Sequence, residues 1–241
     1  MATVKLTSGY EIPLIGLGTW QSKVGEVKAA VKAAINCGYR LIDCAYIYGN
    51  ETEVGEALRE VFDEGTVQRE EIFIIGKLWN THHHPDDVRP EVLESMKRLG
   101  LKYIDMYLIH WPIAFKRGEE LFPRHADGEL VYDDVHYLKA WKELEKCVDE
   151  GLIRSLGLAN FNSEQVEDVL THGRIRPTLL QVELHPYFHQ RKLVEFCRQR
   201  DIVVCAYSSL GSPGTGGIDA GVRSLLEDDA LKAIGARHGK T

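Results

Sequence analysis

Short apolar segments alternate along this chain with longer segments of helical periodicity. The apolar segments are rich in Ile, Val and Leu and lack the polar alternation of a half-exposed strand. Such segments are typical of parallel strands that are buried on both faces. The predicted strands are Leu14–Gly18, Tyr39–Asp43, Ile72–Lys77, Ile104–His110, Ser155–Asn160, Thr178–Glu183 and Ile202–Tyr207.

Helical segments follow the predicted strands. In Val24–Ile35 the apolar residues recur on one face of a helix. Asn50 is a favoured cap for the next helix, and Glu53 three residues later suggests a capping box. Pro85 opens a third helix, because proline is tolerated in the first turn. Four more helices are predicted from apolar positions within residues 138–148, 166–170, 193–197 and 225–237.

The alternation of strands and helices indicates parallel β-α-β units, which leaves two architectures. A doubly wound dinucleotide-binding sheet carries G-x-G-x-x-G after its first strand, but Gly16–Gln21 lacks the third glycine. A (β/α)8 TIM barrel is therefore favoured, as one domain over residues 1–241, with Pro112–Asp134 as a surface loop. A closed barrel needs eight strands and only seven are predicted, so we expect a truncated chain without the eighth.

The charge balance excludes some classes of function. The 241 residues include 29 Lys and Arg against 36 Asp and Glu, which gives a net charge of −7. An acidic chain without a basic stripe is not expected to bind nucleic acid. No apolar run approaches the roughly 18–20 residues that cross a bilayer, and residues 1–10 do not resemble a signal peptide. The five cysteines form no C-x-x-C pair, which is typical of reduced thiols in a cytoplasmic protein.

Polar residues stand at the carboxyl ends of the predicted strands, where barrel enzymes carry their active sites. Asp43, Lys77 and His110 end the second, third and fourth strands, and Tyr48 lies in the loop after Asp43. A buried Lys77 needs a carboxylate partner, which Asp43 can supply across one strand spacing. A neighbouring ammonium lowers the pKa of a phenol, so we expect Tyr48 to act as a general acid. His110 would hydrogen-bond a carbonyl oxygen of the substrate.

Each of these residues also has a simpler interpretation. Asp43 and Lys77 could form a structural ion pair, and His110 could be a core histidine. Tyr48 could serve packing alone. The triplet His82–His84 predicts no functional metal site, because adjacent side chains do not converge and no carboxylate is spaced to join them.

Further residues fall at the same predicted rim. Tryptophans just after three strand ends would form an apolar pocket there. The polar residues at the later strand ends are Asn160, Gln181 and Tyr207, and the tryptophans are Trp20, Trp79 and Trp111.

Five collinear segments carry a resemblance that spans nearly the whole chain: Gly16–Trp20, Leu41–Glu51, Ile74–Trp79, Asp105–Pro112 and Gln181–Tyr187. With these segments the sequence resembles the aldo-keto reductase superfamily, closest to its aldose and aldehyde reductase branch. The resemblance implies a (β/α)8 barrel with an N-terminal β-hairpin, here at Thr3–Leu6 and Glu11–Leu14. It also implies that this chain lacks the family's eighth strand, its segment that binds the adenosine 2′-phosphate, and its C-terminal specificity loop.

The resemblance further implies an NADPH-dependent, metal-free enzyme, expected as a monomer, that reduces aldehydes and ketones to alcohols. Tyr48 would donate the proton, Lys77 would lower its pKa, Asp43 would complete the charge network and His110 would orient the carbonyl. In the cofactor site, Tyr207 would stack on the nicotinamide, two amides would bind its carboxamide, and residues 208–212 would cover the pyrophosphate. The cofactor-binding residues would be Thr19, Trp20, Asp43, Asn160, Gln181, Tyr207, Ser208, Leu210 and Ser212. The substrate pocket would be lined by Trp20, Trp79, His110, Trp111 and Phe122.

Two other functions remain open at this point. The same fold serves in non-catalytic structural or regulatory proteins, although such a role does not require an intact set of Asp43, Tyr48, Lys77 and His110. Alternatively, Lys77 could form a Schiff base with a carbonyl substrate, because buried lysines can become nucleophiles.

Overall fold

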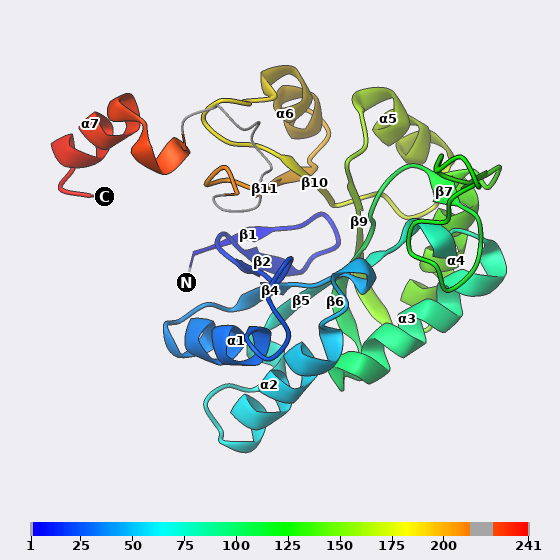
Figure 1. The fold of residues 1–241 in the computed structure, drawn as a ribbon, viewed down its shortest axis with the longest axis horizontal. Coiled ribbons are helices and arrows are strands. Elements are labelled where there is room, and N and C mark those ends of the chain that lie inside the picture. Colours follow the sequence, from blue (N-terminus) through cyan, green and yellow to red (C-terminus); the bar gives the residue numbers. More distant parts are fainter. Residues whose placement is uncertain (1, 213–223, 241) are drawn as a thin grey trace.

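The computed structural model describes residues 2–212 and 224–240, and within them seven parallel strands form one sheet. The sheet curves into a nearly closed barrel, with the strand order β11-β10-β9-β6-β5-β4-β3 (Figure 1). An α/β barrel of parallel strands was predicted, and it is confirmed. The strands are β3 (Leu17–Gly18), β4 (Leu41–Asp43), β5 (Phe73–Leu78), β6 (Ile104–Ile109), β9 (Ile153–Ala159), β10 (Leu179–Glu183) and β11 (Val203–Tyr207).

The first strand of the barrel is shorter than its apolar sequence predicts. β3 begins at Leu17, whereas Leu14 and Ile15 are 62% and 60% exposed. The Leu14 amide donates to the carbonyl of Ala2 at 3.0 Å, so this residue continues the N-terminal hairpin instead of the barrel. The hydrogen bond to Ala2 is long-range, and the local run of apolar residues does not reveal it.

An antiparallel hairpin precedes the barrel, as the resemblance implied. It is formed by β1 (Thr3–Lys5) and β2 (Glu11–Pro13). Leu6 and Ile12 are 2% and 3% exposed and pack in one cluster with the barrel-interior side chains of Leu41 and Phe73. Because Leu41 and Phe73 begin their strands, the hairpin covers the amino-terminal end of the barrel. The opposite end is left for the site.

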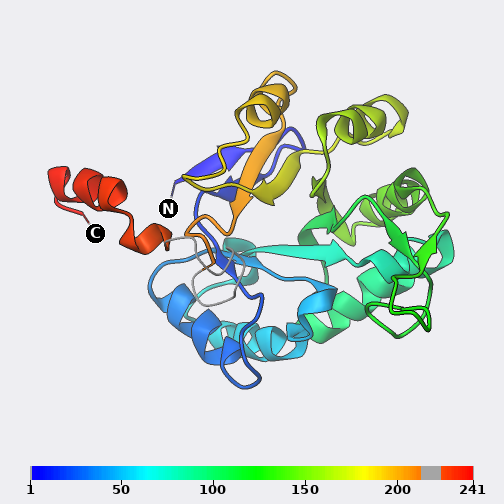
Figure 2. The same ribbon diagram turned by 45° about the horizontal axis from the view of Figure 1, so that its top comes forward.

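Helices surround the curved sheet from outside, and their apolar faces form a second cluster with the outward side chains of the strands (Figures 1 and 2). The last helix differs, because it has no buried residue and lies apart from the barrel. Within the described residues the helices are α1 (Val27–Asn36), α2 (Glu51–Asp63), α3 (Pro85–Leu99), α4 (Tyr137–Asp149), α5 (Ser163–His172), α6 (Arg191–Arg198) and α7 (Asp229–Arg237). None of these helices is long and apolar enough to cross a membrane.

The start of α2 corrects one local prediction. Asn50 precedes the helix, but its side chain donates to the Thr19 carbonyl at 2.8 Å and caps nothing. The Glu53 carboxylate accepts from the Gly25 amide at 2.9 Å, so the predicted capping box is wrong. Hydrogen bonds to the loop after β3 have displaced the local ones. Pro85 does stand in the first turn of α3, as predicted.

The segment Pro112–Asp134 crosses the surface as a loop, as predicted. It is pinned by a small antiparallel pair that the sequence did not indicate, β7 (Ala114–Phe115) with β8 (Tyr132–Asp133). Both residues of β7 are buried, so this loop packs firmly against the barrel.

Candidate active site

Three predicted residues meet at the carboxyl ends of β4 and β5. Asp43 is the register partner of Ile75, and Lys77 lies two residues further on the same inward face of β5. Lys77 is fully buried, and its ammonium donates to the Asp43 carboxylate. It also donates to the Cys44 carbonyl at 2.9 Å and to the Tyr48 hydroxyl at 3.2 Å. Tyr48 reaches this position from the short 3-10 helix Tyr46–Tyr48, which follows β4.

The charge state of this cluster follows from burial and proximity together. Burial alone would lower the pKa of Lys77, but the Asp43 carboxylate and the Tyr48 phenol more than offset it and hold the pKa above its usual value. Burial raises the pKa of Tyr48 to about 12, although the Lys77 ammonium acts in the opposite direction. Lys77 does lower the Tyr48 pKa, as predicted, but burial raises it by more, so the net change is upward. At neutral pH the phenol keeps its proton.

His110 follows β6 and lies against the same cluster. Its side chain is 8% exposed, and its ring meets the Tyr48 ring edge-on, with 5.9 Å between the ring centroids. Burial, with a smaller contribution from the Lys77 charge, places the pKa of His110 well below its usual range. Its buried Nδ1 has no hydrogen-bond partner in the described part of the chain. A neutral imidazole of this kind can donate one hydrogen bond to a carbonyl oxygen.

Aromatic residues extend the site outward from His110. The Trp79 ring lies 5.3 Å from the His110 ring and 5.3 Å from the Phe122 ring, measured between centroids. Trp79 is 5% exposed, and its indole N–H donates to the Leu121 carbonyl at 2.8 Å. The structure thus brings three of the predicted pocket residues together, His110, Trp79 and Phe122. Trp20 and Trp111 are more open, at 52% and 39% exposed.

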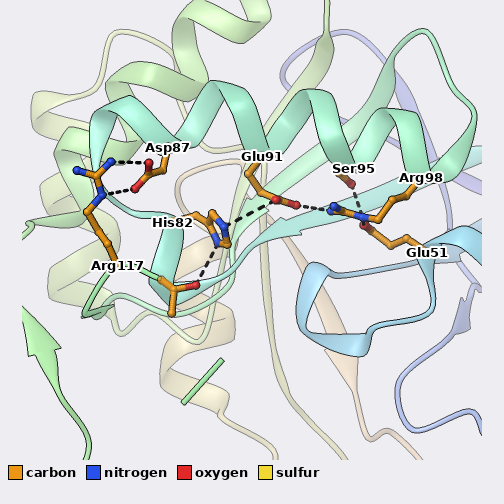
Figure 3. Close-up of polar contacts among 8 residues, drawn as sticks. Glu51, His82, Asp87, Glu91, Ser95, Arg98 and Arg117 are labelled. Carbon is orange, nitrogen blue, oxygen red and sulfur yellow. Dashed lines mark hydrogen bonds and ion pairs between the residues drawn. The ribbon is translucent and has the colours of Figure 1, made fainter. Parts of the chain in front are cut away.

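The loop that carries Phe122 is also fastened to α3. The Arg117 guanidinium makes two hydrogen bonds of 2.6 Å to the carboxylate of Asp87, in the first turn of α3 (Figure 3). The pair is partly exposed, so its contribution to stability is modest. It joins the loop to the first turn of α3.

The amide and tyrosine residues predicted for the cofactor lie on the neighbouring strand ends. Asn160 follows β9 with a left-handed backbone (φ 63°), donates to the His110 carbonyl at 2.9 Å and accepts from the Tyr207 hydroxyl at 2.9 Å. Gln181 of β10 donates to the Asp43 carboxylate at 2.7 Å. Two primary amides beside a tyrosine ring match the hydrogen-bonding and stacking needs of a nicotinamide carboxamide. The donor set therefore fits that group.

The other predicted cofactor residues differ in their exposure to solvent. Thr19 is fully buried, and its hydroxyl donates to the Asp43 carbonyl at 2.8 Å, so it supports the strand end from within. After β11 the chain turns tightly, with the Ser212 and Ser208 hydroxyls 2.5 Å apart. Leu210, at the tip of this turn, is 62% exposed.

Two further contacts were not predicted from the sequence. One is the Cys44 carbonyl, which accepts from Lys77, and the other is the Asn50 side chain, which holds the Thr19 carbonyl. A backbone acceptor carries no sequence signal. Asn50 did carry one, but the residue pattern pointed to a helix cap.

The three adjacent histidines point into different surroundings. The His82 ring packs on Tyr46, with 4.7 Å between centroids, His83 is 1% exposed, and His84 accepts from the Asp86 amide at the start of α3. Within residues 2–212 and 224–240, no group of three or more His, Cys, Asp or Glu side chains is arranged to hold a metal ion.

The fold and the cluster define a parallel α/β-barrel enzyme with its polar site at the carboxyl ends of the strands. The model of the Aldo/keto reductase family matches residues 14–222. Aldo-keto reductase family 1 member A1 of Mus musculus is 50% identical over 241 residues, which cover 100% of this chain and 74% of that protein. The Homo sapiens protein of that name is 50% identical over 239 residues, or 99% of this chain and 74% of that protein.

A solved structure agrees with the sequence matches. The aldose reductase from Schistosoma japonicum superimposes with a TM-score of 0.93 at 46% identity, covering 100% of this chain and 76% of that one. The chain belongs to the aldo/keto reductase family, a family of oxidoreductases.

Proposed function

We propose that this protein reduces aldehydes and ketones to alcohols with NADPH, and that Tyr48 donates the proton. The observation that carries the proposal is the contact between the buried Lys77 ammonium and the Tyr48 hydroxyl at 3.2 Å, with Asp43 on the other side of the lysine. NADPH, when bound, supplies the hydride that goes to the carbonyl carbon. The small-molecule carbonyl substrate then needs one proton on its oxygen.

Tyr48 is suited to supply that proton. With a pKa of about 12 it is fully protonated at neutral pH. Once the proton leaves for the substrate oxygen, the phenolate faces an ammonium that is already in place and already charged. Because Lys77 is held by Asp43 and by the Cys44 carbonyl, little reorganisation is needed at that moment. The developing charge is thus stabilised in the transition state more than in the ground state.

His110 and the aromatic residues would place the substrate. The neutral His110 ring can donate to the carbonyl oxygen, while the neighbouring Trp79 and Phe122 rings form an apolar wall. Such a wall suits aldehydes with an aromatic or aliphatic body, and it excludes water from the reacting carbonyl. The name of the Schistosoma japonicum relative, aldose reductase, supports an aldehyde substrate.

The cofactor would lie along the ends of β9, β10 and β11. Asn160 and Gln181 would bind the carboxamide, and Tyr207 would stack on the nicotinamide after releasing Asn160. Trp20 would touch the same end, and the turn of Ser208, Leu210 and Ser212 would cover the pyrophosphate. Cytoplasmic location accompanies this proposal, because NADPH and reduced cysteines belong to that compartment.

Tyr48→Phe tests the proposal. The variant should keep its fold and its affinity for NADPH, but lose about 10²–10⁴-fold in turnover of an aromatic aldehyde, followed by the loss of NADPH absorbance. Tyr10→Phe is the matched control, because it removes a hydroxyl at the opposite end of the barrel. Near-normal turnover by Tyr48→Phe would contradict Tyr48 as the donor. A wild-type chain that binds NADPH and reduces no aldehyde would contradict the activity itself.

A further inference from the structure

A second polar network lies behind the active site, between α2 and α3. Figure 3 shows it running along α3, from His82 through Glu91 and Arg98 to Glu51. The Arg98 Nε donates to Glu51 at 2.8 Å, and the same guanidinium donates to Glu91. Ser95 donates to the other oxygen of Glu51 at 2.7 Å. Glu51, Glu91 and Ser95 are 2%, 4% and 0% exposed, so the network is buried in the helix layer.

Each of these buried carboxylates requires a partner, because moving an unpaired carboxylate out of water is costly in free energy. Neither Glu51 nor Glu91 belongs to the cluster around Lys77. Both are held by the one Arg98 guanidinium, whose planar group can serve two carboxylates at once. Arg98 is therefore the centre of the network.

The network is joined to the segment that carries Tyr48. The Arg98 guanidinium carbon lies 5.3 Å from the centre of the Tyr46 ring, within the range of a cation–π contact. The Tyr46 ring also meets the His82 ring in a T-shaped contact, with 4.7 Å between centroids. Tyr46 is the first residue of the 3-10 helix that ends at Tyr48, and Glu51, three residues after Tyr48, is the first residue of α2. Arg98 thus contacts a residue on each side of Tyr48 along the chain.

His82 ties the same network to the other side of the site. It ends the 3-10 helix Asn80–His82, which follows Trp79 directly. Its Nε2 lies 3.9 Å from a Glu91 oxygen, and its Nδ1 lies 3.1 Å from the Thr81 hydroxyl. The turn that carries Tyr48 and the segment that carries Trp79 are therefore both in contact with side chains of α3.

We propose that Arg98 is a positioning residue that sets the distance between the Tyr48 hydroxyl and Lys77 by clamping the turn Tyr46–Tyr48 against α3. The proposal rests on the proposed role of Tyr48. Because Lys77 is fixed on β5, a movement of the turn away from β5 lengthens the Tyr48–Lys77 contact directly. A misplacement of about 1 Å in such a group costs on the order of 10²-fold in rate.

The test compares two arginine-to-methionine variants of the full chain. Arg98→Met should lower kcat roughly 10- to 100-fold, with little change in KM or in NADPH affinity, because the amides that would bind the cofactor lie on other strands. Arg69→Met is the matched control. Arg69 also pairs with a buried carboxylate, Asp105 at 2.7 Å, and also packs on a tyrosine ring, but it precedes β5 at the opposite end of the barrel. Arg69→Met should lose stability and keep kcat.

Two further measurements separate positioning from a general loss of structure. Amide hydrogen exchange should accelerate in residues 46–50 of Arg98→Met and stay unchanged there in Arg69→Met. Arg98→Lys should recover only part of kcat, because an ammonium lacks the planar set of donors that serves both carboxylates at once. An Arg98→Met variant with normal kcat and normal exchange would overturn the proposal. If the wild type reduces no aldehyde, the proposed function fails, and the exchange comparison still decides whether Arg98 holds the turn.

Discussion

Removing the buried ammonium tests the energetics of the site independently of any activity. Lys77→Met keeps most of the side-chain volume but takes the donor away from three acceptors: the Asp43 carboxylate, the Cys44 carbonyl and the Tyr48 hydroxyl. Breaking a buried ion pair from one side costs about 3–5 kcal/mol. Asp43 is 17% exposed and keeps its bond from Gln181 at 2.7 Å, so we expect the lower end, about 3 kcal/mol.

The double variant Asp43→Asn/Lys77→Met makes the prediction specific. The double variant removes the Asp43 charge, which Lys77→Met alone leaves without its ammonium partner. It should therefore be more stable than Lys77→Met alone by at least ~1 kcal/mol. Lys146→Met is the control, because Lys146 is 63% exposed and pairs with Glu143 on the surface of α4. It should change the free energy of unfolding by less than about 0.5 kcal/mol.

Equilibrium urea unfolding at pH 7, monitored by far-ultraviolet circular dichroism, measures these differences. The comparison requires that the unfolding free energy has the same dependence on urea concentration in all variants. The reasoning is refuted if Lys77→Met loses less than about 1 kcal/mol, or if the double variant is no more stable than the single one.

Two further predictions concern stability. Burial lowers the pKa of His83 to about 3, below the unfolded value of about 6.5, so stability is full above pH 6.5 and falls as the pH drops below it. The loss should reach about 2 kcal/mol at pH 5, and His83→Gln should lose less than the wild type between pH 7 and 5 in urea unfolding; an equal loss would show that His83 is not the group involved. Asn160→Ala should lower Tm more than Asn160→Gly, because both lose the same hydrogen bonds but alanine in the left-handed region costs a further ~1–2 kcal/mol; the reverse order would be inconsistent with φ 63°.

The sequence alone favoured the barrel over a doubly wound sheet and located the chemistry at the strand ends. Buried parallel strands are recognised from continuous apolar runs, and their carboxyl ends share one rim once the strands are parallel. Asp43, Lys77 and His110 could therefore be assigned to that rim from their positions at strand ends, and Tyr48 from its place in the following loop. These inferences needed only chain order and side-chain period, which are local properties.

The tertiary structure decided what depends on desolvation and on contacts between distant segments. Whether the Tyr48 pKa rises or falls depends on the balance between burial and the Lys77 charge. The sequence reveals the charged residue, but it does not reveal how deeply the phenol is buried. Asn50 left its expected cap because the Thr19 carbonyl lies within reach, and Arg98 gained its role because α3 packs beside the start of α2. In both cases the acceptor lies far along the chain, 31 and 47 residues away, and only folding brings it near.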